Sequence, residues 1–81
     1  MRVQTPAPSS VELRRLLDRL CMQLGFCLPP AEQVRLTDDP PDSADAFTDA
    51  IFTAEGLDPS TADRNLYRQV QRLVREAFRR S

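Results

Sequence analysis

The chain has 81 residues, of which 41% are hydrophobic and 28% are charged, and its formal net charge is −1. A chain of this length forms one domain at most and buries only about 60% of the surface that its unfolded form exposes. Histidine and lysine are both absent. The sequence therefore lacks the commonest general base and metal ligand, and it lacks the amine that Schiff-base and Walker-type phosphate chemistry require. We expect a protein that is not an enzyme.

The composition also bears on source and compartment. All 11 basic residues are arginine, and alanine and proline are plentiful, as is typical of proteins from GC-rich bacterial genomes. The first residues contain no apolar run like that of a signal peptide. No segment has the roughly 20 apolar residues that cross a bilayer. We therefore expect a cytoplasmic bacterial protein without membrane contact, in which Cys21 and Cys27 are reduced and pack as small apolar residues in preference to forming a disulfide.

The first predicted helix follows a short tail. Residues 1–8 contain two prolines and no periodicity, which predicts a disordered N-terminal tail before a single helical domain over residues 9–81. Ser9 and Glu12 have the spacing of a capping box, and Gly25 has the position of a terminating residue. Between them, apolar residues recur at intervals of three and four, which indicates one buried stripe. These residues are Leu13, Leu16, Leu17, Leu20, Cys21 and Leu24.

Two further helices are predicted in the middle of the chain. A short helix runs from Pro30 to Leu36, since proline is accepted in a first helical turn. A linker over residues 37–42 follows, because proline cannot continue a helix. Asp42 or Ser43 then caps a third helix that runs to Glu55. Its predicted inner face consists of Ala44, Phe47, Ala50, Ile51 and Ala54.

The most regular pattern lies between Arg64 and Arg80. Asp58 and Pro59 are expected to open this last helix as its cap and first residue, with Ser60 and Thr61 as alternative caps. At about 100° per residue, the apolar side chains fall on one side of the helix and five arginines fall within roughly 80° of each other on the opposite side. We call these five residues the arginine stripe: Arg64, Arg68, Arg72, Arg75 and Arg79. The four helices predict an all-α fold, a small bundle of three long helices plus one short helix.

Charge is distributed unevenly along the chain. Residues 36–63 carry eight acidic residues and no basic one, whereas residues 64–81 carry six arginines and one glutamate. Phe52 falls near Asp45 and Asp49, away from the main apolar face of its helix. One interpretation is an exposed anchor for a partner, and the other is burial against a second neighbouring helix. We predict partner-binding residues on both charged surfaces, namely Phe52, Asp45, Asp49 and the arginine stripe.

Asp42 and Ser43 also allow a different interpretation. They resemble the Asp-Ser-Leu motif of acyl and peptidyl carrier proteins, which are acidic four-helix domains of similar length. The resemblance implies a phosphopantetheine group on Ser43. The chain differs at Ala44, where carrier proteins have leucine, and in the two prolines at positions 40 and 41, which replace a glycine-containing approach. The other interpretation of Ser43 is an ordinary helix cap.

These patterns favour a protein that acts by binding another protein, as a regulator, an adaptor or an immunity-type inhibitor. Self-association through the opposite charges is a second form of the same hypothesis. Nucleic-acid binding through the arginine stripe is an alternative, but a pI of about 5.3 and the acidic neighbouring segment oppose it. The acidic residues of the segment 36–63 lack the glycine and final glutamate of an EF-hand loop, so we predict no metal site. Because histidine and lysine are absent, we also predict no cofactor and no catalytic residue. The sequence leaves open whether the acidic segment covers the arginine stripe.

Overall fold

The structure, a computed structural model, describes residues 8–80. Within this range the chain forms four helices and no strand, which confirms the predicted all-α fold with one short helix. The helices are α1 (Ser10–Leu24), α2 (Pro30–Asp38), α3 (Ala44–Ala54) and α4 (Arg64–Arg80). None of these four has the length and apolar character of a membrane span. Of the predicted N-terminal tail, residues 1–7 lie outside the described residues, and Pro8 is buried.

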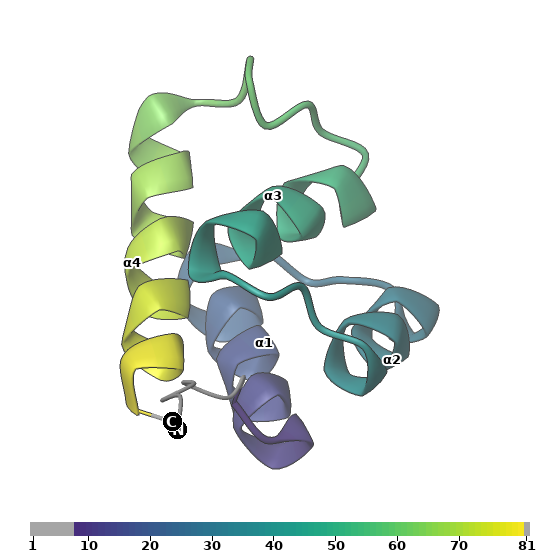
Figure 1. Ribbon diagram of the computed structural model, residues 1–81. Coiled ribbons are helices and arrows are strands. Elements are labelled where there is room, and N and C mark those ends of the chain that lie inside the picture. The colour runs from purple at the N-terminus through teal and green to yellow at the C-terminus, as the bar shows by residue number, and fades with distance from the viewer. Residues whose placement is uncertain (1–7, 81) are drawn as a thin grey trace.

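The arrangement of the helices centres on α4. It packs against both α1 and α3, whereas α2 packs against α1 (Figure 1). The segment over residues 55–63 arches from the end of α3 to the beginning of α4 (Figure 1). The buried apolar side chains form one core, to which α2 contributes a single residue. They are Leu13, Leu16, Leu17, Leu20, Phe26, Leu28, Leu36, Phe47, Ile51, Phe52, Val70 and Val74.

Helix α1 begins and ends as the sequence predicts. The Ser9 hydroxyl accepts a hydrogen bond from the Glu12 N–H at 3.3 Å, and the Glu12 carboxylate accepts one from the Ser9 N–H at 3.1 Å. Gly25 has a φ of 73°, a left-handed conformation that glycine adopts without steric cost. Its N–H donates to the Cys21 carbonyl, and the Phe26 N–H donates to the Leu20 carbonyl, both at 3.0 Å. This turn reverses the chain after α1.

The beginning of α3 agrees with one of its two predicted caps. Ser43 is the cap of α3, because its Oγ accepts from the Ala46 N–H at 3.1 Å. The helix ends at Ala54, one residue before the predicted end. Helix α2 begins at Pro30 as predicted but continues to Asp38, two residues past Leu36.

The predicted beginning of the last helix is wrong. Helix α4 begins at Arg64, and Asp63 caps it by accepting hydrogen bonds from the N–H groups of Asn65 at 2.8 Å and Leu66 at 3.4 Å. The Asp58 carboxylate instead accepts from the N–H and the hydroxyl of Ser60, at 2.9 and 2.7 Å. These two bonds hold the pKa of Asp58 below its usual value, the hydroxyl having the larger effect. Asp58 therefore stabilises a local turn and is not a helix cap.

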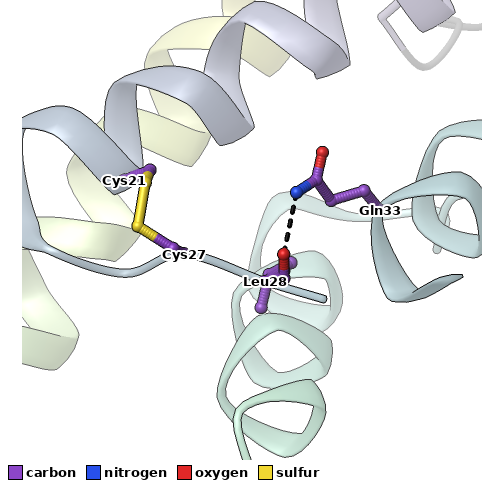
Figure 2. The surroundings of a disulfide bond; sticks show 4 residues. All are labelled: Cys21, Cys27, Leu28 and Gln33. Carbon is purple, nitrogen blue, oxygen red and sulfur yellow. Dashed lines mark hydrogen bonds between the residues drawn. A yellow bond between two sulfur atoms is a disulfide. The ribbon is translucent and has the colours of Figure 1, made fainter. Parts of the chain in front are cut away.

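The expectation of reduced cysteines is also wrong. Cys21 and Cys27 form a disulfide, with their Cα atoms 4.3 Å apart (Figure 2). The physical reason is the turn at Gly25, which brings the residues that follow α1 back over its last turn. Cys21 is half-buried and Cys27 is exposed, so neither is a core residue. Sequence spacing alone does not indicate this proximity.

Phe52 is not an exposed anchor, and its assignment to a partner surface is wrong. Its side chain is 0% exposed, and its ring lies 4.9 Å from the ring of Phe26 and 5.2 Å from that of Tyr67, measured between centroids. Helix α3 therefore has two apolar neighbours, α4 on one side and the turn after α1 on the other. Phe47, on the same helix, packs against Phe78 of α4 at 5.6 Å. Burial against a second neighbour was the alternative interpretation of Phe52.

Candidate functional site

The site predicted from the sequence is the outer face of α4. Val70 and Val74 are 0% exposed on the inner face of this helix. All five members of the arginine stripe are exposed on the opposite side: Arg64, Arg68, Arg72, Arg75 and Arg79. The helix is therefore fixed in its rotation by the core, and this rotation directs the guanidinium groups outward.

One member of the stripe is neutralised by the acidic segment. The Arg75 guanidinium donates to both carboxylate oxygens of Asp45, with Nη2 lying 3.1 Å from Oδ1 and 3.4 Å from Oδ2. The Gln71 amide donates to the same Oδ1 at 3.1 Å. Asp45 thus links α3 to α4 instead of standing free for a partner. The question that the sequence left open has a partial answer, since α3 covers one edge of the stripe.

The second predicted acid of α3 is also engaged with α4. The Tyr67 hydroxyl donates to Asp49 Oδ1 at 2.6 Å. This hydrogen bond, together with burial and the negative charges of Asp49 and Asp45, raises the pKa of Tyr67 to about 12. Helical periodicity places Tyr67 on the apolar side of α4 and does not indicate this hydrogen bond, because the partner of its hydroxyl lies 18 residues away on another helix.

Four arginines of the stripe remain available. None of them forms a salt bridge with a carboxylate of residues 8–80. We call this group, which omits Arg75, the arginine surface: Arg64, Arg68, Arg72 and Arg79. Arg64 lies at the edge of a shallow depression that it shares with Asp49, Asp58 and Tyr67. Its positive charge is therefore offset in part by nearby acids, and the three other guanidinium groups dominate the surface.

The acidic residues do not converge on a centre. Within residues 8–80, no group of three or more acidic or cysteine side chains has the arrangement of a metal site. The acidic residues are distributed over a helix cap, a local turn and an interhelical contact, as Asp63, Asp58 and Asp45 respectively illustrate. Ser43, the candidate carrier residue, is exposed and its hydroxyl accepts the capping bond of α3.

Sequence reasoning did not identify a groove between α1 and α4. The groove has a volume of about 570 Å³, and its lining includes Leu16, Ala77 and Met22. The Met22 side chain is 85% exposed, and the Arg19 guanidinium lies 4.0 Å from the Glu76 carboxylate across the two helices. The one available signal was an apolar residue, Met22, outside the apolar stripe of α1. Met22 indicates a groove only once it is known which helix packs beside α1.

Comparison of the chain with models of protein families found no match, and comparisons with curated proteins and with solved structures found none either.

Proposed function

We propose that the protein is not an enzyme and that it acts by binding an acidic partner protein through the arginine surface, as a regulator, an adaptor or an immunity-type inhibitor does. The observation that carries the proposal is the contrast within the stripe. Asp45 neutralises Arg75, whereas Arg68, Arg72 and Arg79 are exposed without a carboxylate partner among residues 8–80. A guanidinium group binds a carboxylate through two parallel hydrogen bonds, so such a row suits several acids on one partner surface.

The spacing of the arginines also supports the proposal. Arg68 and Arg72 are four residues apart on a helix, which places their Cα atoms about 6 Å apart along the axis. A partner helix with acids at a four-residue spacing presents carboxylates at the same interval. Such complementarity accelerates encounter and disfavours wrong partners more than it increases affinity.

Several features favour a protein over a nucleic acid as the partner. Carboxylates border the arginine surface on both sides, Asp45 and Asp49 from α3 and Glu76 on α4 itself. A continuous phosphate backbone that extends beyond the arginines therefore meets negative charge. The surface also has no exposed aromatic side chain on which bases stack, since Tyr67 is partly buried and engaged with Asp49.

The test is affinity capture from a lysate of the source organism, with and without nuclease, followed by measurement of binding to the purified protein that is recovered. The variant is Arg68→Glu/Arg72→Glu. The matched control is Arg14→Glu/Arg15→Glu, which changes the net charge equally through exposed residues of α1. We expect the first variant to weaken binding at least tenfold and the control to retain it, with affinity falling as salt rises. Equal binding by both variants, or recovery that disappears with nuclease, would refute the proposal.

The compartment and the carrier hypothesis need separate tests. We propose a bacterial cytoplasmic location, in which thiols are normally kept reduced. Alkylation of thiols in intact cells before lysis measures the fraction of the chain that carries the disulfide there.

For the carrier alternative, intact mass after co-expression with a phosphopantetheinyl transferase is decisive. The capping bond at Ser43 accounts for that residue without a prosthetic group, so we expect no added mass.

A further inference from the structure

The disulfide lies at the turn that connects α1 to α2. Cys21 belongs to the last turn of α1, and Cys27 is three residues before the first residue of α2 (Figure 2). Cys27 is exposed and Cys21 is half-buried. The disulfide therefore fixes the beginning of the path to α2 against α1, and solvent reaches it from the side of Cys27.

Helix α2 depends on this attachment more than the other helices do. It packs mainly against α1, buries only Leu36 and Thr37, and has no side-chain cap at its beginning. The Gln33 amide donates to the Leu28 carbonyl at 2.8 Å, which joins the helix to the turn that contains Cys27 (Figure 2). Val34 of α2 is 51% exposed. Few buried apolar contacts are the mark of a segment that opens locally.

The rest of the fold has a core of its own. Helices α1, α3 and α4 supply all of the side chains that are 0% exposed. These residues are Leu13, Leu20, Phe47, Thr48, Ile51, Phe52, Val70 and Val74. Undocking of α2 itself removes only Leu36 from the apolar core, whereas Phe26 and Leu28 of the preceding turn are core residues of their own.

We propose that the Cys21–Cys27 disulfide is a redox-exchange site, opened by a dithiol reductant, that controls the docking of α2. A thiolate of the reductant attacks Sγ of Cys27, the more exposed residue, and Sγ of Cys21 departs as a thiolate that takes up a proton. The second thiolate of the reductant then attacks the reductant's other sulfur atom, which is bonded to Sγ of Cys27 in the mixed disulfide. This step releases the Cys27 thiolate, which is protonated in turn. The protein gains two electrons and two protons, and the dithiol becomes a disulfide.

The size of the effect follows from the loop that the bond closes. The two cysteines are six residues apart in the sequence. In a fully unfolded chain, a link of that length changes the equilibrium about 40-fold, and this is the upper limit for an opening in which α1 stays folded. In the oxidised protein, residues 25–29 cannot leave α1 freely, so α2 docks again rapidly. In the reduced protein this covalent restraint is absent and only the burial of Phe26 and Leu28 still holds the turn, so the open state becomes more populated. The mechanism does not involve the arginine surface.

Hydrogen exchange by NMR or mass spectrometry tests the proposal on the whole chain, in dithiothreitol and in an equal concentration of its oxidised form. In dithiothreitol, amides of α2 should exchange more than threefold and up to about 40-fold faster, while amides of α1 and α4 change less than threefold. Removal of the reductant and reoxidation should restore protection. Cys21→Ser/Cys27→Ser should reproduce the reduced pattern and be insensitive to dithiothreitol.

Three results would overturn it. One is equal loss of protection in all four helices, which would make the disulfide a general stabiliser. Another is unchanged protection of α2 in fully reduced protein. The third is a disulfide that dithiothreitol reduces only in denaturant. Comparison of the wild type before and after reduction avoids any dependence on the folding of the serine variant.

Discussion

Replacing Phe52 with alanine should destabilise the protein by about 3–5 kcal/mol, the usual cost of removing a buried phenylalanine side chain. The site supports this magnitude, because the side chain is 0% exposed and contacts the rings of Phe26 and Tyr67. Those rings belong to the turn after α1 and to α4, so the cavity would lie between two elements that the Phe52 ring joins. The total stability expected for 81 residues is about 4–12 kcal/mol.

Urea unfolding followed by circular dichroism measures this effect. Because Phe52→Ala approaches the total stability, Phe52→Leu provides a milder variant with an expected loss below about 1.5 kcal/mol. Leu57→Ala is the matched control, since Leu57 is 42% exposed and should change the free energy of unfolding by less than about 0.5 kcal/mol. A loss below 1 kcal/mol for Phe52→Ala would show that the ring is exposed after all, and would restore the interpretation of Phe52 as an anchor for a partner.

Two further predictions concern the contacts between α3 and α4. Tyr67 is the single tyrosine of the chain, so absorbance at 295 nm should show a midpoint near pH 12 in the folded protein and near pH 10 in urea, and Asp49→Ala should lower the folded-state midpoint by removing the largest cause of the raised pKa. Because the folded-state pKa is raised, the stabilisation from Tyr67 is complete below pH 10 and is lost as the pH rises towards 12; a midpoint near 10 in the folded wild type would contradict the hydrogen bond. For Asp45 and Arg75, whose side chains are 60% and 54% exposed, a double-mutant cycle should give a coupling of about 0.2–1 kcal/mol that decreases with salt. A coupling above 2 kcal/mol would show that this pair is more shielded from water than its exposure indicates.

The candidate site shows which features a sequence pattern predicts and which it does not. The periodicity of α4 identified the arginine stripe, because helix geometry alone decides which residues share a face. The pattern did not indicate that Arg75 is neutralised and Arg72 is not. That difference depends on the position of Asp45, which is 30 residues away along the chain and is brought close by the packing of α3.

The turn after α1 shows the same limit. Gly25 was recognised as a terminating residue because only glycine adopts the left-handed conformation without steric cost. Whether Cys27 then meets Cys21 depends on the exact course of the next two residues, and a default based on compartment gave the wrong answer.

Local signals were sufficient for the elements themselves. The capping box at Ser9, the cap at Ser43 and the apolar stripes of three helices act over three to four residues, and each is present in the structure. The cap of the last helix was predicted wrongly, and Asp63 was not among the candidates. Asp58 and Asp63 both have the chemistry of a cap, and only the course of residues 55–63 decides between them.

The sequence by itself determined the helices, their apolar faces and the row of arginines, since these depend on short-range geometry and hydrogen bonding. Tertiary structure alone decided the burial of Phe52, the disulfide, the neutralisation of Arg75 and the groove beside Met22. Each of these depends on which helices become neighbours. That choice is made by the packing of the whole core, and it is not encoded in any single segment.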